Sequence, residues 1–301
     1  MPGFDDLLRL LPPSTRHRAS RLVRGFAVLA LCLHAPGLAA SPVAMVSHCE
    51  GQISIIADGR SSPCTLLSYL DSATRLKLGA NALVKLVYFD KALEIPVRGP
   101  IEVAVEVAVD VAQDPAGVRS LALVRDTGLV PSDRLAQASV VMRGGHRIEG
   151  LRPDNGRLLQ APTRLRWSAV PGASRYTVEL TDETAAVVFS TDTRTTTVAL
   201  PAELRFSAGG YYEWHVQASV EGRRFQADAS FELADVSLQT RLRRLASSAA
   251  NSLTDALLYG LVLEELELWE AAGHHWQMLA RQHPDEPALQ DRAKAALSGS
   301  P

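Results

Sequence analysis

Ile-Glu-Val-Ala-Val-Glu-Val-Ala-Val-Asp-Val, residues 101–111, is the stretch that decides the fold. Its odd positions are Ile or Val and its even positions are acidic or Ala, the period of two typical of a strand with one packed and one wet face. Glu102, Glu106 and Asp110 also stand four apart, but a helix would carry β-branched residues all round its surface. The pattern therefore predicts a strand. Its eleven residues exceed the usual strand length, so we expect a bend or bulge within it.

Shorter strand-like segments surround this stretch. They cover 50–56, 64–70, 74–79, 82–89 and 93–97, and Pro96 places the last of them at a sheet edge because proline cannot donate to a ladder. Short strands with no helix between them predict a β-sandwich or β-helical roll. We expect a first, β-rich domain with its linker over 40–152. It would include further strands at 121–124 and 139–143, with a loop at 126–135.

Turn glycines and alternating aliphatic residues follow one another through these segments: Gly51, Ile53, Ile55, Leu76, Leu78, Ala82, Val84, Leu86, Leu93, Gly99 and Pro100. Their order resembles the periplasmic FecR-like domain. The resemblance covers about residues 48–111 and implies a β domain outside the cytoplasm. The better-known FecR regulators resemble membrane-spanning proteins with a cytoplasmic segment that handles a sigma factor. This chain has only about two dozen residues before its apolar run, so sigma-factor control is not expected.

The first 39 residues have the features of a secretory signal peptide. Arginines such as Arg21 and Arg24 precede an apolar run at 25–33, and Gly37 and Ala39 fit the small-residue positions of a cleavage site. We expect cleavage before Ala40 and export to the periplasm. An uncleaved inner-membrane signal anchor is the alternative, although the apolar run is shorter than the roughly twenty residues that span a bilayer.

Export affects the interpretation of the cysteines. Cys32 leaves with the signal peptide, so Cys49 and Cys64 remain as an even pair in an oxidising compartment, and we predict a disulfide between them. A hairpin turning at 58–59 would place Cys64 opposite residues 53–56. The bond therefore requires the segment around Cys64 to fold back beside the start of the first strand.

Residues 153–234 predict a second β domain. A tryptophan, a Pro-Gly-Ala turn, a tyrosine strand and a Tyr-x-Trp-x-Val strand follow in order, and this succession resembles a fibronectin type III sandwich. The resemblance implies that Trp167 is the core aromatic of an early strand and that Tyr212 forms a tyrosine corner. Tyr176 and Trp214 are also expected in the core, although a ligand-stacking role of the aromatics is the alternative.

The period becomes helical in residues 235–301. Ser252 and Asp255 form a capping-box-like start to a helix over 253–266, and further helices are expected at 269–282 and 286–297. The tail contains Leu268-Trp-Glu-Ala-Ala, then Trp276, Leu279-Ala and Pro284. This succession resembles one tetratricopeptide unit, with Pro284 at its characteristic end. Because so few repeats do not stand alone, we expect the tail to pack against the sandwich, a second copy or a partner.

No catalytic constellation is apparent in the sequence. It contains no Gly-rich phosphate loop and no Gly-x-Ser-x-Gly elbow. Strand spacing places successive acids of the row at 102, 106 and 110 about 13 Å apart, too far to share one cation. We expect no cofactor, no metal and no enzymatic activity. Two further groups are expected on the solvated surface: His274, His275 and His283, and Glu264, Glu265 and Glu267.

Two functions fit these features. The chain is mildly acidic, with a net charge of −2 and no basic run, so nucleic acid is not an expected ligand. The first hypothesis is an envelope interaction or scaffold module that partners an inner-membrane sensor. The alternative is a signal-transduction regulator that senses cell-wall glycan or another extracytoplasmic ligand. Paired exposed aromatics over a groove would favour the alternative, and a large apolar patch on the tail would favour the first.

Overall fold

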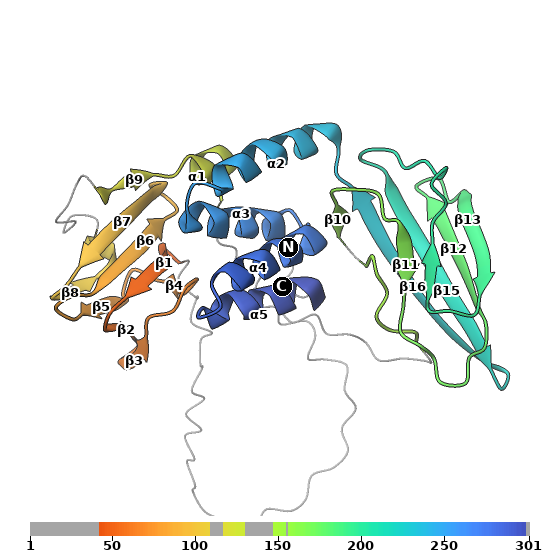
Figure 1. Ribbon diagram of the computed structural model, residues 1–301, viewed down its shortest axis with the longest axis horizontal. Coiled ribbons are helices and arrows are strands. Elements are labelled where there is room, and N and C mark those ends of the chain that lie inside the picture. Colours follow the sequence, from red (N-terminus) through yellow and green to blue (C-terminus); the bar gives the residue numbers. More distant parts are fainter. Residues whose placement is uncertain (1–41, 109–116, 130–146, 155, 299–301) are drawn as a thin grey trace, which may run out of the picture. The chain divides into compact units, whose positions relative to one another are not determined.

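The N-terminal strands form two antiparallel sheets (Figure 1). The computed structural model describes residues 42–108, 117–129, 147–154 and 156–298. The first sheet has the order β4-β1-β6-β7-β9 and the second the order β3-β2-β5-β8. In chain order the strands are β1 Ala44–Glu50, β2 Ile53–Ala57, β3 Arg60–Pro63, β4 Tyr69–Leu70, β5 Arg75–Leu78, β6 Leu83–Tyr88, β7 Leu93–Arg98, β8 Ile101–Ala104 and β9 Arg119–Ser120.

The two sheets share a hydrophobic core. Alternate residues of a strand share a face, so Ala44 and Val46 of β1 lie on one side of the first sheet. There they join Leu86 of β6, Ile55 of β2 and Leu76 of β5 in one buried cluster. One face of the first sheet is therefore covered by the second sheet.

The other face of the first sheet is covered by helices. Met45 and Val87, the chain neighbours of Ala44 and Leu86, belong to a different cluster that contains Leu261 and Trp276 of the helical part. The first sheet is thus a middle layer, buried on both faces. We expected the tail to pack against the sandwich, a second copy or a partner. That expectation did not include the N-terminal sheet, which is the tail's main apolar partner.

The C-terminal part is a bundle of four helices (Figure 1). Ser252 begins α3 as predicted: its Oγ accepts a hydrogen bond from the backbone N–H of Asp255 at 3.1 Å. The predicted helices at 253–266, 269–282 and 286–297 are confirmed to within one residue at each end. The helices are α2 Val236–Ala249, α3 Leu253–Glu265, α4 Trp269–Gln282 and α5 Pro287–Ser298.

A third set of strands lies between these parts in sequence and has its own core. One sheet has the order β10-β16-β15-β12-β13 and the other consists of β11 and β14. Pairing is antiparallel except between β10 and β16, which are parallel. The predicted succession of β-sheets followed by helices is therefore confirmed. The strands are β10 Arg157–Leu158, β11 Arg164–Arg166, β12 Tyr176–Asp182, β13 Val187–Thr193, β14 Thr197–Ala199, β15 Tyr211–Val220 and β16 Arg223–Leu233.

The long strand predicted at 101–111 is shorter in the structure. Its strand portion, β8, ends at Ala104, and Val105–Val107 form a 3₁₀ turn. The backbone of Val105 leaves the ladder because its N–H donates to the Thr74 carbonyl at 2.9 Å and its carbonyl accepts from Tyr88 Oη at 2.6 Å. The expected bend thus falls at Val105, and residues 109–111 lie outside the described residues.

Two other strand predictions have different outcomes. The strand expected at 121–124 is wrong, because α1 Ala122–Thr127 covers it and buries Leu123 and Val124 in the helical core. The strand expected at 139–143 lies outside the described residues. The expectation that Pro96 places its strand at a sheet edge is wrong, because β7 lies between β6 and β9. Proline is tolerated there because β9 pairs with β7 at Leu93 and Glu94, before Pro96 is reached.

Residues Ala40–Pro301 form one compact unit. None of the described helices is both long enough and apolar enough to cross a membrane.

Candidate functional site

A groove of about 340 Å³ lies where strands β10 and β11 approach helices α4 and α5. Two hydrogen bonds fix the strand side to the helix side. The N–H of Arg157 donates to the Glu267 carbonyl at 2.9 Å, and Nη2 of Arg152 donates to the Leu297 carbonyl at 2.8 Å. One wall contact is therefore backbone to backbone, and the other joins the Arg152 side chain to the backbone at the end of α5.

The strand wall of the groove carries arginines. Leu165 is fully buried in the core, so its neighbours Arg164 and Arg166 on β11 both point away from that core, and both line the groove. Their guanidinium groups make no hydrogen bond or ion pair with any described residue. Two positive charges are thus available at this wall.

Arg152 lies directly opposite Arg166. Their backbones exchange hydrogen bonds of 2.8 and 3.0 Å in an antiparallel bridge, a pairing that places the two side chains on the same face. Like charges directly opposite each other destabilise a pair of strands. Arg152 has a weak ion pair with Asp154 at 4.0 Å, and Arg166 has none with the described residues.

The helix wall contributes a carboxylate, an imidazole and an indole ring. Glu270 and His274 stand four apart on α4 and so share a face, with Trp269 beside them at the helix start. Trp269 is half-buried. On the strand side, burial raises the pKa of Asp154 above its ordinary value, although the charges of Arg152 and Arg147 oppose this shift. The groove therefore combines several cations with fewer acids.

Arg157 also lines the groove, and its hydrogen-bonding groups are only partly paired. Its Nη2 lies 3.3 Å from the Glu232 carboxylate, but its buried Nε has no hydrogen-bond partner in the described structure. A buried donor without an acceptor is unusual in a native protein.

A second polar cluster joins the first sheet to α3 and is buried. Glu94 of β7 accepts hydrogen bonds from Thr254 and from Ser47, the latter at 3.2 Å, and pairs with Arg119 at 2.9 Å. Arg119 also pairs with Asp255 at 2.7 Å. Burial alone would raise the pKa of Glu94, but the hydrogen bonds from Thr254 and Arg119 and the charge of Arg119 outweigh it and hold that pKa below its ordinary value. Every partner is internal, so this cluster connects two layers and offers no open site.

The glutamates of α3 differ from the expected solvated row. Glu264 is buried, accepts a hydrogen bond from Trp276 Nε1 at 2.8 Å and pairs with Arg292 at 3.0 Å. Burial raises its pKa, although Arg292 and the Trp276 hydrogen bond act against the shift. The expectation is therefore wrong for Glu264, whereas Glu265 and Glu267 are exposed.

The histidines predicted at the surface lie in different environments. His274 is exposed in the groove, whereas His275 is half-buried with Nε2 2.7 Å from the Ala256 carbonyl oxygen. Burial lowers the pKa of His275. In the parts of the chain that the structure describes, no three His, Cys, Asp or Glu side chains are grouped so that they could hold a metal ion.

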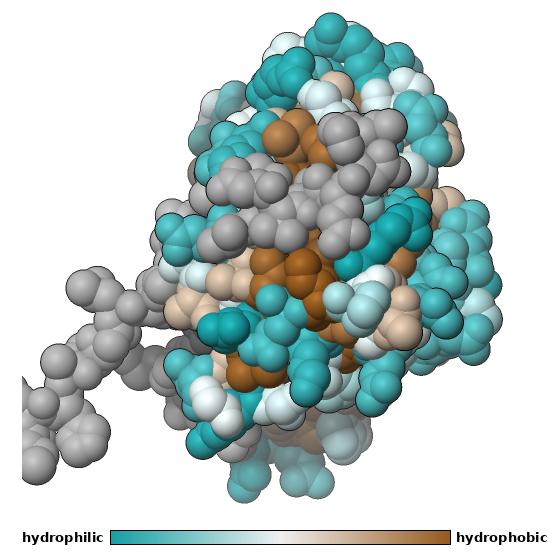
Figure 2. Space-filling view, turned by 90° about the vertical axis from the view of Figure 1, so that its left-hand side faces the viewer, coloured by the Kyte–Doolittle hydropathy of each residue, from teal (hydrophilic) through white to brown (hydrophobic). Residues whose placement is uncertain are grey.

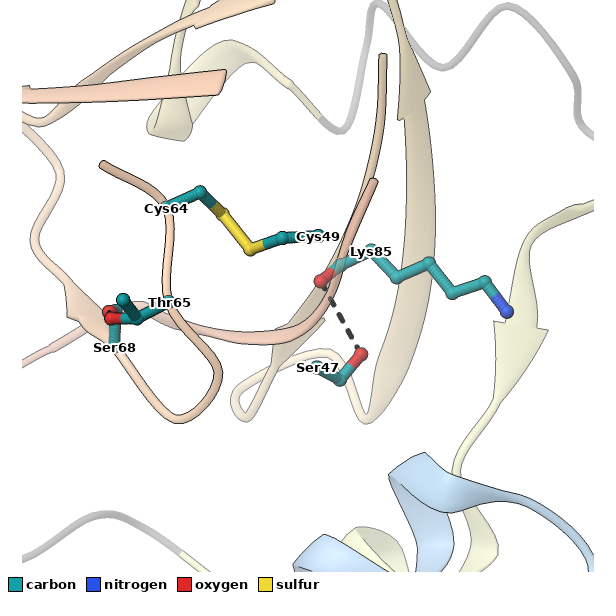
Figure 3. The surroundings of a disulfide bond; sticks show 6 residues. All are labelled: Ser47, Cys49, Cys64, Thr65, Ser68 and Lys85. Atoms are coloured by element: carbon teal, nitrogen blue, oxygen red, sulfur yellow. Dashed lines mark hydrogen bonds between the residues drawn. A yellow bond between two sulfur atoms is a disulfide. The ribbon is translucent and has the colours of Figure 1, made fainter. Parts of the chain in front are cut away.

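A disulfide joins Cys49 at the end of β1 to Cys64 after β3 (Figure 3). The N–H of Cys64 donates to the Ile53 carbonyl at 3.2 Å, so the hairpin places Cys64 beside residue 53 as expected. Gly51, with a φ of +80°, turns the chain between β1 and β2, so that Cys49 also lies near the start of β2. The two cysteine Cα atoms are 6.2 Å apart. Nearby, Ser47 Oγ donates to the Lys85 carbonyl, and the Thr65 and Ser68 hydroxyls share a hydrogen bond at 2.7 Å (Figure 3).

The resemblance residues of the first domain lie at strands and turns. Ile53 is buried in the core of the two sheets. Gly99 and Pro100 form the turn between β7 and β8. A side chain at Gly99 would collide with the carbonyl oxygen of Gly79, so this turn requires glycine.

The aromatics predicted in the second domain lie in its core. The Trp167 ring centroid is 5.4 Å from that of Tyr176 and 6.2 Å from that of Trp214. Tyr212 Oη accepts a hydrogen bond from the Ser207 N–H at 2.8 Å, the backbone bond expected of a tyrosine corner. All four aromatics are buried, so none is available as a stacking platform.

The groove arginines were not identified in the sequence. A signal was present: Arg152, Arg157, Arg164 and Arg166 lie within fifteen residues, and the last two share one strand face. Their convergence depends on the bridge between Arg152 and Arg166, which sequence spacing does not predict. Comparison of the sequence with protein-family models and with curated proteins finds no match.

Proposed function

We propose that the chain is a non-enzymatic protein-interaction module of the cell envelope, exported by residues 1–39, and that it binds a partner such as an inner-membrane sensor in the groove between β10–β11 and α4–α5. The observation that carries this proposal is the groove itself. It is open, holds about 340 Å³, and presents Arg164 and Arg166 without ionic partners among the described residues. Arginines at an open surface are suited to binding because guanidinium groups stay charged and donate several hydrogen bonds.

The proposal places the binding surface away from the apolar faces of the helices. Among the residues that the structure describes, the large hydrophobic side chains that remain exposed are spread over four elements: Val187 of β13, Tyr211 of β15, Val236 of α2 and Met278 of α4. On the face drawn in Figure 2, hydrophobic residues appear in patches that hydrophilic residues interrupt. A polar groove is therefore a better candidate for the contact than an apolar patch on the tail.

The finer fold assignments are part of this proposal. We assign the first two sheets to a FecR-like domain on the turn glycines Gly51 and Gly99. We assign the next two sheets to a fibronectin type III-like domain on the Tyr212 corner and the Trp167 core. Both kinds of domain serve commonly as extracytoplasmic modules, in keeping with binding in the envelope.

The alternative, a sensor of cell-wall glycan, has less support. Stacking on sugars favours exposed aromatic faces, often in pairs. Of the two aromatic residues that line the groove, Phe231 is buried and Trp269 is half-buried. The charged walls favour an ionic partner over a neutral sugar.

A pull-down from an envelope extract tests the function. The chain lacking residues 1–39 contains the whole compact unit and serves as bait, with residues 147–234 alone as the control bait. We expect a specific envelope protein on the longer bait only, because the shorter one lacks the helix wall of the groove. Absence of any protein specific to the longer bait would contradict the proposed function.

A further inference from the structure

We propose that the groove binds an extended acidic peptide segment, with the carboxylates of alternate residues held by Arg164 and Arg166. This inference rests on the proposed function and specifies the chemistry of the partner. It starts from the strand geometry. Residues two apart on a strand are separated by about 7 Å and point the same way, as do alternate side chains of an extended ligand.

The opposed arginines supply an independent observation. Arg152 and Arg166 face each other across a hydrogen-bonded bridge, where like charges cost stability. The Asp154 carboxylate, 4.0 Å from Arg152, balances the charge of Arg152 but not that of Arg166. The Arg152 guanidinium also donates to the Leu297 carbonyl, whereas Arg166 has no ionic partner among the described residues. A ligand carboxylate beside Arg166 would supply the missing counter-charge and offset the repulsion.

The type of anion follows from the remaining wall residues. Arginine forks bind carboxylate and phosphate equally well in geometric terms. Asp154, Glu267 and Glu270 also line the groove, however, and they repel a doubly charged phosphate more than a singly charged carboxylate. The backbone N–H groups of a peptide can also donate hydrogen bonds to these carboxylates. The mixed charges therefore favour an acidic peptide.

A binding assay tests the ligand class. A dye-labelled peptide with glutamate at alternate positions is titrated with the chain lacking residues 1–39, beside a matched peptide with glutamine at the same positions. We expect the glutamate peptide to bind and the glutamine peptide to bind at least about tenfold more weakly, since charged hydrogen bonds are lost. Equal binding of the two, or no binding of the glutamate peptide, overturns the proposal. So does binding of inorganic phosphate in the groove without binding of the peptide.

Matched variants test the position of the site. Arg164→Thr/Arg166→Thr removes both charges at exposed strand positions with a residue that suits strands. Arg223→Thr/Arg224→Thr makes the same change at exposed positions of β16 that do not line this groove. We expect the first variant to lose at least about tenfold in affinity and the second to bind as the wild type does. The reverse order, or no loss in the first variant, overturns the site.

A stability measurement separates binding from a structural role. Arg166→Thr removes the repulsion opposite Arg152, so the urea midpoint of the free protein should rise or stay level while affinity falls. A lower midpoint would make Arg166 a structural residue and overturn its assignment.

The envelope pull-down then distinguishes the two proposals. If the wild-type chain captures a specific protein and Arg164→Thr/Arg166→Thr captures it equally, the acidic-peptide site fails and the interaction function stands. If the wild-type chain captures none, the function fails.

Discussion

At the scale of single residues, Glu94 makes the stability of the molecule depend on acid pH. Its pKa is lowered in the folded state, so its stabilising contribution is present above the ordinary value of 4.5 and is lost as the pH falls below that value. Glu94→Gln removes the charge that compensates Arg119, and we expect the free energy of unfolding at pH 7 to fall by about 2 kcal/mol. The decline of this free energy between pH 5 and pH 3 should also be shallower in the variant than in the wild type.

Urea denaturation of wild type and variant at several pH values measures both effects. Glu102→Gln is the matched control, because Glu102 pairs with Arg75 at 3.1 Å on the exposed surface. Such exposed pairs contribute about 0–1 kcal/mol. An acid profile that is the same in Glu94→Gln and wild type would contradict the assignment.

The disulfide is a second residue-scale feature with a measurable effect. Cys49 and Cys64 are separated by 15 residues, and closing a loop of that length stabilises by about 3 kcal/mol in the chain-entropy model. We expect Cys49→Ser/Cys64→Ser to lower the unfolding free energy by about that amount. Reduction of the wild type should have the same effect and leave the variant unchanged. Peptide mapping of the exported protein under non-reducing conditions checks the bond directly, and two alkylatable thiols would show that it is absent.

At the scale of elements, helices were predicted more accurately than strands. Ser252 and Asp255 fix the start of α3, and a local capping pattern requires no knowledge of the rest of the fold. The end of β8 at Ala104 depends instead on Thr74 and Tyr88, which hold the backbone of Val105 from other elements. A period-two pattern identifies the buried face but does not locate the point at which pairing stops.

The double burial of the first sheet also left a signal in the sequence. The stretches Ala44-Met-Val and Leu86-Val-Tyr-Phe are continuously apolar, whereas a sheet with one wet face alternates. All of these residues are buried, and alternate ones face the second sheet and the helices. Strands that are apolar on both faces indicate that a further layer covers the second face of the sheet. They did not indicate that residues more than 150 positions later supply it.

The contact between α3 and α4 leads to an element-scale prediction. A side chain at Gly260 of α3 would overlap the Trp276 ring of α4. Alanine favours a helix by about 1 kcal/mol over glycine, but overpacking a core typically costs about 1–3 kcal/mol. We therefore expect Gly260→Ala to lower the melting temperature.

Thr240→Ala on the exposed face of α2 is the control for helix propensity. It should leave the melting temperature unchanged or raise it slightly. A Gly260→Ala protein more stable than the wild type would mean that α3 and α4 do not pack through this glycine.

At the scale of the whole molecule, export is tested at the N-terminus. The basic residues, the apolar run at 25–33 and the small residues before Ala40 predict cleavage there. N-terminal sequencing of the protein from the envelope fraction should start near Ala40. An intact N-terminus recovered with the membrane would establish an anchor instead.

The shared core makes the N-terminal sheets and the helices interdependent. Deleting 235–301 removes the helices that cover Met45, Val87 and Phe89, and it leaves Glu94 without Thr254. Exposing these side chains costs roughly 1.5–3 kcal/mol each, a large share of the 5–15 kcal/mol that stabilises a typical protein. We expect residues 40–234 to lose the folded N-terminal sheets. Residues 147–234 should fold alone, because their aromatic core is a separate cluster.

Hydrogen exchange on the two fragments decides between these outcomes. In 40–234, amides of β1, β6 and β7 should lose the protection they have in the full chain, while amides of β12 and β15 keep it. If β1 and β6 stayed protected without the helices, the second sheet alone would suffice to hold the first, and the helices would be free to bind a partner through their apolar faces. Loss of protection in β1 and β6 would leave the polar groove as the surface for the partner, because the apolar faces of the helices are then needed to keep the molecule folded.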